Sequence, residues 1–362
     1  MAKHKISKKF WSPLVNELSP YHPGEQPTQD NYIKLNTNEH PYSPSPKVRK
    51  AMIKMLEING EKLKLYPDPE NTELRKAIAS YFKVEIDQVF VGNGSDEVLA
   101  FVFQTLFSKR GLLVFPEITY SFYPSLAKLF GIKTKTLKIK DNFKIDLEKI
   151  DRTAKSVIFA NPNATTGLFL QVKKIEQFLS SNPNKLLVVD EAYVDFGCSS
   201  CVPLTKKYSN LLVVQTFSKS RALAGMRLGF AIGNLSLIEA LNRTKNSFNT
   251  YPIDRLASEA GINSIKDHSW FEINKIRVMK NRDFLTENLK KIGFKVIKSK
   301  ANFILTSHKQ VEAYQIFNKL KKNKILVRHF KDKKIKDWVR ISIGTKTECL
   351  KLLRVLKNIL KD

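Results

Sequence analysis

The stretch that decides the fold is Leu186-Leu187-Val188-Val189-Asp190-Glu191-Ala192-Tyr193. Four consecutive aliphatic residues are typical of a strand that helices cover on both faces, as in a mostly parallel sheet. An acidic residue follows them directly. In open α/β sheets ligands bind beyond the carboxyl ends of the strands, so Asp190 is predicted to lie at a binding edge.

Other short β-rich runs alternate with helical stretches between about residues 89 and 233. They are Val89 to Val91, Leu112 to Phe115, Ser156 to Ala160, Leu211 to Val214 and Gly229 to Ile232. The alternation predicts an α/β fold with a mostly parallel central sheet and helices on both faces. Polar or Gly-rich loops follow four of the runs, at residues 92–96, 161–163, 190–191 and 216–219. We expect these loops to meet at one edge of the sheet.

The pattern changes near the C-terminus. A long helix is expected around residues 273–292, followed by strand-like runs at 295–297, 303–305, 325–327 and 338–343. This order favours a smaller α+β unit. The first forty residues, rich in Pro and Asn, are predicted to form an extended arm. We therefore predict a large domain over residues 37–272, and a second unit that joins residues 1–36 to the small domain at 273–362.

Composition excludes some classes of protein. The 62 Lys and Arg residues exceed the 34 Asp and Glu residues by 28. The basic residues are scattered along the chain, which indicates a solvated surface more than a nucleic-acid site. No run is long and apolar enough for a membrane span, and no signal-peptide core is found. Three cysteines, with Cys198 and Cys201 lacking a second ligand pair, predict reduced thiols and no metal site. A soluble cytoplasmic protein is expected.

The segment from Ser218-Lys219 to Arg227 contains a candidate catalytic lysine and a candidate anion-binding arginine. A lysine in a loop after a buried strand loses hydration, which lowers its pKa and lets the neutral amine attack an aldehyde. Asp190 ends a run too apolar for an uncompensated carboxylate, so it needs a buried partner. The alternatives are an ordinary surface lysine and, for Asp190, the N-cap of a helix.

Taken in order, these motifs resemble those of the fold-type I pyridoxal-phosphate aminotransferases of class II, and most of all the histidinol-phosphate aminotransferases. The resemblance extends from Leu18-Ser19-Pro20-Tyr21-His22-Pro23-Gly24-Glu25-Gln26-Pro27 to Val339-Arg340-Ile341-Ser342-Ile343-Gly344. Single motifs are weak, but their order and spacing are specific.

The resemblance implies roles around the pyridoxal ring. Lys219 would hold the cofactor as a Schiff base and move a proton between the substrate Cα and cofactor C4′. Asp190 would pair with the protonated pyridine nitrogen. Tyr193 and Asn163 would bind the O3′ oxygen. The loop Asn161-Pro162-Asn163-Ala164-Thr165-Thr166-Gly167 departs from the family, because Thr-Thr stands where Pro-Thr is commoner.

The same resemblance implies a phosphate site and a stacking residue. The Gly-rich turn at residues 92–97 precedes an expected helix, so its backbone N–H groups could bind a phosphate. An ordinary strand-to-helix turn capped by Ser95 or Asp96 would have the same sequence pattern. Tyr120 would stack on the ring, with a core tyrosine as the alternative; its neighbours Phe122 and Tyr123 are expected in the core. The predicted cofactor set also contains Gly94, Ser95, Asp96, Thr216, Ser218, Arg227 and, reaching the neighbouring subunit of a homodimer, Tyr66.

The substrate side is implied by three residues. Arg340 matches the arginine that grips the glutamate carboxylate and, in turn, the phosphate of histidinol phosphate, helped by Arg328 and by Asn38. A surface salt bridge is the alternative for Arg328. The implied reaction is ping-pong transamination between glutamate and imidazole-acetol phosphate. Alternatives are an aromatic amino-acid aminotransferase, an amino-acid-phosphate decarboxylase and, outside enzymes, a DNA-binding regulator.

Overall fold

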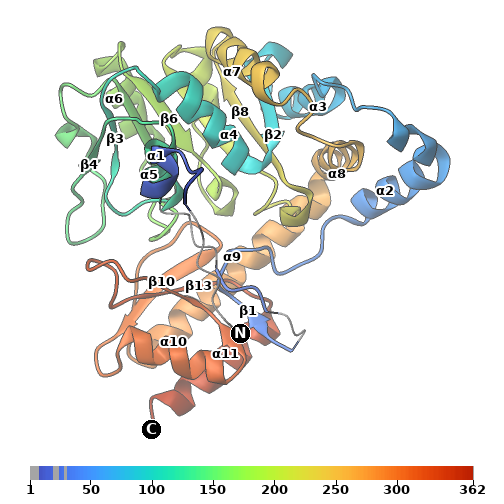
Figure 1. Ribbon diagram of the computed structural model, residues 1–362. Coiled ribbons are helices and arrows are strands. Elements are labelled where there is room, and N and C mark those ends of the chain that lie inside the picture. Colours follow the sequence, from blue (N-terminus) through green and yellow to red (C-terminus); the bar gives the residue numbers. More distant parts are fainter. Residues whose placement is uncertain (1–7, 19–23, 28–30, 362) are drawn as a thin grey trace.

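A computed structural model describes residues 8–18, 24–27 and 31–361 (Figure 1). Its largest element is a seven-stranded sheet in the order β2-β8-β7-β6-β5-β3-β4, here called the large sheet. All neighbouring strands from β4 to β7 are parallel, and β8 alone runs antiparallel to its neighbours β7 and β2. The strands are β2 (Val89–Asn93), β3 (Leu113–Pro116), β4 (Thr134–Leu137), β5 (Ser156–Ala160), β6 (Leu186–Asp190), β7 (Leu211–Thr216) and β8 (Leu228–Gly233). The predicted α/β class is confirmed.

Both faces of the large sheet are covered, as the apolar runs predicted. In β6, Leu187 and Val189 join one buried cluster, whereas Leu186 and Val188 join another on the opposite face. The first cluster includes residues of α3 (Thr72–Phe82), α6 (Val172–Ser181) and α8 (Arg255–Lys266). The second includes α4 (Gly94–Val102), α5 (Phe122–Leu129) and α7 (Leu235–Phe248).

One strand of the large sheet was not predicted. β4 forms the edge beside β3, and its residues Thr134, Lys135 and Thr136 are exposed. An edge strand carries little of the apolar pattern that marks a central strand, since it buries fewer side chains.

The smaller α+β unit is present below the large sheet in Figure 1. Its four antiparallel strands, here called the small sheet, have the order β12-β13-β10-β9. The strands are β9 (Phe294–Val296), β10 (Phe303–His308), β12 (Arg328–His329) and β13 (Val339–Ser342). The long helix α9 (His268–Lys291) leads into this unit, and α10 (Ala313–Lys322) and α11 (Lys346–Ile359) share its buried cluster.

The N-terminal arm joins the small unit through a short strand. β1 (Ile33–Lys34) pairs in parallel with β11 (Ile325–Leu326). The arm is not wholly extended, because α1 (Pro13–Glu17) is helical. α2 (Pro46–Asn59) follows the arm and extends from the body in Figure 1. Within the described ranges no helix has the length and apolar character needed to cross a bilayer.

Candidate active site

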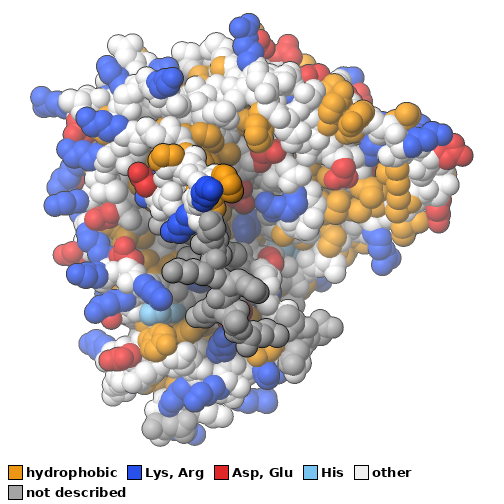
Figure 2. Space-filling model, viewed as in Figure 1, with side chains coloured by type: hydrophobic (Ala, Val, Ile, Leu, Met, Phe, Trp, Pro, Cys, Tyr) orange, Lys and Arg blue, Asp and Glu red, His pale blue; other side chains and the backbone are white. Residues whose placement is uncertain are grey.

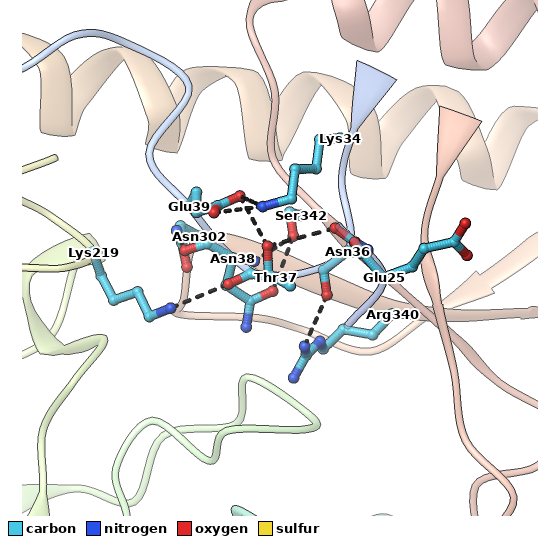
Figure 3. A network of polar contacts seen from close by, with 10 residues as sticks. All are labelled: Glu25, Lys34, Asn36, Thr37, Asn38, Glu39, Lys219, Asn302, Arg340 and Ser342. Carbon is cyan, nitrogen blue, oxygen red and sulfur yellow. Dashed lines mark hydrogen bonds and ion pairs between the residues drawn. The ribbon is translucent and has the colours of Figure 1, made fainter. Parts of the chain in front are cut away.

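Lys219 lies in the loop that follows β7, where three parts of the chain meet. Its Nζ donates a hydrogen bond to the backbone oxygen of Thr37 at 3.1 Å, as Figure 3 shows. The same nitrogen lies 5.9 Å from the centroid of the Tyr193 ring. Burial, followed by the positive charge of Arg340, lowers the pKa of Lys219 to about 8. The amine is therefore far more often neutral near pH 8 than an ordinary lysine.

Asp190 ends β6 with its carboxylate buried, and 4% of the residue is exposed. The Tyr123 hydroxyl donates to Oδ2 at 2.8 Å, and the N–H of Ala192 donates to Oδ1 at 3.1 Å. Burial raises the pKa of Asp190 to about 6, while the hydrogen bonds and the charge of Lys219 act in the opposite direction. No α-helix follows Asp190 directly; the next element is the short 3-10 helix Val194–Phe196. The helix-cap alternative is therefore wrong.

The turn between β2 and α4 brings backbone N–H groups close to a guanidinium. Gly94 has φ +83°, and a Cβ there would lie 2.6 Å from a terminal nitrogen of Arg227. A Cβ at Gly229 would lie 2.3 Å from the backbone nitrogen of Ser95. Gly94 is thus favoured by its left-handed backbone, whereas Gly229 is required because the backbone of Ser95 approaches it closely. The first turn of α4 and Arg227 together form a cationic cradle that fits a phosphate group.

An acidic side chain links this cradle to an aromatic ring. Asp96 accepts from the Tyr120 hydroxyl at 2.9 Å and pairs with Arg227 at 3.3 Å. In the turn before Lys219, the N–H of Ser218 donates to Thr216 Oγ1 at 3.1 Å, and the two hydroxyl oxygens are 3.0 Å apart. The two sets are neighbours, because Thr216 pairs in register with Gly229 and Gly229 packs against the backbone of Ser95.

Tyr193 and Asn163 have different surroundings. Asn38 donates its amide to the Tyr193 hydroxyl at 3.1 Å. The Asn163 oxygen accepts from the backbone N–H groups of Thr165 and Thr166, both at 3.0 Å, and its amide donates to Ile118 at 2.9 Å. Asn163 thus braces its own loop, a role its position did not predict. Any contact with a ligand would have to use its Nδ2.

Arg340 extends from β13 of the small sheet towards the loops of the large sheet. Its guanidinium donates to the backbone oxygens of Ala164 at 2.8 Å and Asn36 at 3.3 Å. It also lies 5.1 Å from the ring centroid of Phe303 and 5.5 Å from that of Phe330. The two aromatic rings and the two backbone oxygens together orient the Arg340 guanidinium. The site is therefore built from residues of both the small and the large sheet.

Asn38 joins the arm to the small sheet. Its N–H donates to Ser342 Oγ at 2.9 Å, and that hydroxyl donates to Asn38 Oδ1 at 3.0 Å. The amide of Asn302 donates to the Asn38 backbone oxygen at 2.9 Å (Figure 3). The sequence did not single out Ser342 or Asn302 as site residues, because their hydrogen-bond partner lies more than 260 positions away in the chain.

Arg328 and Tyr66 have different positions relative to the site. Arg328 is the strand neighbour of Arg340 in the register of β12 and β13, and its guanidinium is 5.9 Å from the Phe330 ring. Tyr66 is 77% exposed and its ring stacks on that of Tyr251 with centroids 4.6 Å apart. The N-terminal motif at 18–27 can be followed only in part, because residues 19–23 lie outside the described ranges.

Comparisons with known proteins identify the family of the chain. The family described as aminotransferase class I and II matches residues 30–356. A histidinol-phosphate aminotransferase of Hydrogenovibrio crunogenus is 50% identical over 353 residues, covering 98% of each chain. The solved histidinol-phosphate aminotransferase of Clostridium acetobutylicum is 27% identical, with a TM-score of 0.81 over 90% of this chain and 98% of that one.

A third likeness concerns the fold alone. The histidinol-phosphate aminotransferase of Sinorhizobium meliloti, solved in complex with pyridoxal-5'-phosphate, has a TM-score of 0.86 at 22% identity, covering 97% of this chain and 98% of that chain. Because the family match spans most of the sequence and the relative is half identical over nearly its full length, the chain belongs to the class I and II aminotransferase family.

Proposed function

We propose that this chain is a pyridoxal-phosphate-dependent transaminase that moves an amino group between glutamate and imidazole-acetol phosphate, forming histidinol phosphate in histidine biosynthesis. The observation that carries the proposal is the environment of Lys219. Its amine is buried and donates a hydrogen bond to the backbone oxygen of Thr37. After burial, Arg340 lowers its pKa most, and Arg227 lowers it further, whereas Glu39 and Asp96 raise it. The names of the half-identical relatives support the same substrate.

The residues present fit the cofactor. When bound, pyridoxal phosphate supplies an aldehyde and a protonated pyridine ring that takes up electrons. The neutral amine of Lys219 is suited to attack that aldehyde and then to carry a proton between the substrate Cα and C4′. Asp190 is the buried carboxylate suited to hold the N–H of the pyridine. Tyr193, held by Asn38, and Asn163 would hydrogen-bond O3′.

The phosphate fits the opposite end of the same site. Backbone N–H groups of Gly94, Ser95 and Asp96 lie at the start of α4, beside the guanidinium of Arg227. The hydroxyl of Ser218 would add a donor, positioned by Thr216. Tyr120, fixed by its bond to Asp96, would cover one face of the ring. The backbone N–H groups, the Arg227 guanidinium and the Ser218 hydroxyl together supply the hydrogen-bond donors that a phosphate dianion requires.

Arg340 would bind the anionic end of each substrate in turn. Its planar guanidinium can pair with a carboxylate or a phosphate through two parallel hydrogen bonds. Arg328 is its neighbour in the strand register and would add a second positive charge for the phosphate. Asn38 would act by holding the arm against the site, because its bonds reach both Ser342 and Tyr193.

The test follows each half-reaction by the visible absorption of the loaded enzyme. Glutamate and histidinol phosphate should each convert the chromophore to the pyridoxamine form, and 2-oxoglutarate should restore it. Phenylalanine and threonine phosphate test the alternatives, an aromatic aminotransferase and an amino-acid-phosphate decarboxylase. No spectral response to histidinol phosphate, with a full response to phenylalanine, would refute the proposed substrate.

We also propose that the enzyme is a homodimer. Exposed apolar side chains gather on α2 and the segment after it, visible as the orange patches on the right-hand lobe of Figure 2. They include Ile53, Leu56, Ile58, Leu63, Leu65 and Tyr66. Such a patch is typical of a protein interface. Tyr66 would then reach the phosphate in the neighbouring subunit.

Sedimentation measures the mass of an Ile53→Lys, Leu56→Lys double variant. A monomer would support the interface, and an unchanged mass would contradict it.

The positive charge and the thiols bear on partners and location. Lys and Arg side chains are dispersed over the face seen in Figure 2, which favours no nucleic-acid site. Salt-dependent binding to duplex DNA would instead favour the regulator alternative.

The three cysteines are free, and burial raises the pKa of Cys198 to about 12. Unreactive, unpaired thiols fit a reducing compartment, so we place the reaction in the cytoplasm.

A further inference from the structure

Tyr123 is a fully buried tyrosine near the start of α5, with 0% of its surface exposed. Its hydroxyl donates to Asp190 Oδ2 at 2.8 Å. The other hydrogen bond to this carboxylate comes from the N–H of Ala192, at Oδ1. Of the two donors, Tyr123 alone comes from a different segment of the chain. It therefore fixes where the carboxylate lies relative to β3 and α5.

The direction of this hydrogen bond is determined by the surroundings. Burial and the negative charge of Asp190 raise the pKa of Tyr123 well above that of an exposed phenol. The hydroxyl therefore stays protonated and acts as the donor. A buried carboxylate is costly unless donors stabilise its charged form. Removing the hydroxyl would leave Asp190 with the backbone donor and would favour its neutral form.

The ring of Tyr123 has a second contact in the site. It lies edge-on to Tyr120, with centroids 5.8 Å apart and planes at 84°. Tyr120 is the residue expected to stack on the pyridine ring, and Asp190 is the residue expected at its nitrogen. One buried side chain thus touches both groups that would define the plane and the depth of the ring.

We propose that Tyr123 is a positioning residue for the transamination, which holds the charged Asp190 carboxylate through its hydroxyl and the Tyr120 ring through its edge. This inference rests on the proposed function. The substitution Tyr123→Phe separates the two contacts, because it removes the hydroxyl and keeps the ring. Tyr208→Phe is a matched control: its hydroxyl also donates to a carboxylate, that of Glu176 at 3.3 Å, in a pair outside the site.

The decisive measurement compares the affinity of apoprotein for pyridoxal phosphate and for its 1-deaza analogue, which has a carbon in place of the pyridine nitrogen. If Tyr123 acts through Asp190, Tyr123→Phe should weaken binding of pyridoxal phosphate about 10-fold. Binding of the 1-deaza analogue should change less than about 2-fold, because it has no N–H for Asp190 to hold. Equal losses for the two ligands would show a merely structural role and overturn the proposal.

Kinetics and spectroscopy give independent readouts. In Tyr123→Phe, kcat with glutamate should fall about 10- to 100-fold with little change in KM, while Tyr208→Phe stays at the wild-type value. With 15N-labelled pyridoxal phosphate, the pyridine nitrogen signal should move towards the unprotonated position. Wild-type kcat and nitrogen shift in Tyr123→Phe would overturn the inference and leave the proposed function intact. Failure of the wild-type protein itself to bind pyridoxal phosphate would instead refute the proposed function.

A second variant keeps the proposal testable if Tyr123→Phe does not fold. Incorporation of 3-fluorotyrosine at position 123 retains the ring and the hydroxyl and makes the phenol a stronger donor. The preference for pyridoxal phosphate over its 1-deaza analogue should then increase over that of the unmodified protein. An unchanged or reduced preference would contradict the role of the hydroxyl.

Discussion

The large-sheet half of the site and the small-sheet half are assembled from different kinds of contact. Asp190 ends β6, and Lys219 and the turn at Gly94 follow β7 and β2, so one regular sheet positions them. Arg340 and Asn38 instead belong to segments that meet through hydrogen bonds between side chains and backbone, 304 positions apart for Asn38 and Ser342. We expect the half positioned by one sheet to suit fixed chemistry on a cofactor, and the half held by contacts between distant segments to suit substrate binding.

The largest expected effect concerns the large-sheet half. Lys219→Ala should lower transamination by at least about 10⁴-fold, because it removes the amine that attacks the aldehyde and carries the proton. The absorption band of the imine between Lys219 and the cofactor should be lost as well, leaving only that of the free aldehyde. Lys185→Ala is the matched control, since Lys185 also donates to backbone oxygens, those of Asp151 and Arg152, but outside the site. Comparable losses in both variants would contradict a special role for Lys219.

A smaller effect is expected at the key residue of the small-sheet half. Arg340→Lys keeps the charge and loses the planar pair of donors, so kcat/KM for glutamate should fall about 100-fold. The affinity for pyridoxal phosphate should change little if the large-sheet half binds the cofactor and the small-sheet half binds the substrate. Arg354→Lys, at an exposed position of α11, is the control. A loss of cofactor binding in Arg340→Lys would show that the division is wrong.

The pH dependence tests how strongly the two halves are coupled. With its pKa lowered to about 8, Lys219 is mainly an ammonium below pH 8 and mainly a neutral amine above it. The rate at which apoprotein incorporates pyridoxal phosphate should therefore rise about 10-fold from pH 7 to pH 9 and then level off. In Arg340→Met the midpoint should move to higher pH, because the positive charge of Arg340 helps to lower this pKa. A midpoint near 10.5 in both proteins would refute the predicted coupling.

The smallest expected effect lies at the contact between the arm and the small sheet. Ser342→Ala removes two hydrogen bonds to Asn38, and KM for both substrates should rise about 3- to 10-fold. The dissociation constant of pyridoxal phosphate should stay within about 2-fold of the wild-type value. A larger effect on the cofactor than on the substrates would mean that the arm supports the large-sheet half instead.

Particular residues show how far the sequence could be interpreted. The runs around Leu187 and Val213 predicted their strands because buried strands carry an unbroken apolar signal. The edge strand β4 was missed because its residues from Thr134 to Thr136 are exposed. Tyr123 was expected in the core, where it lies, but its bond to Asp190 joins positions 67 residues apart and has no local signal. The bracing role of Asn163 was likewise unforeseen, since it depends on the path of a loop.

The sequence by itself determined the α/β class and placed Asp190 and Lys219 directly after buried strands. The roles of the lysine, the carboxylate and the arginines came from the family resemblance and stay predictions. Hydrophobic periodicity and residue type are local properties of the chain, so they are visible in the sequence itself. The tertiary structure alone decided that Arg340 and the backbone of Thr37 lie near the amine of Lys219, and that Tyr123 donates a hydrogen bond to Asp190. The physical reason is that the pKa of Lys219 and the charge of Asp190 depend on burial and on neighbours brought together only when the chain packs.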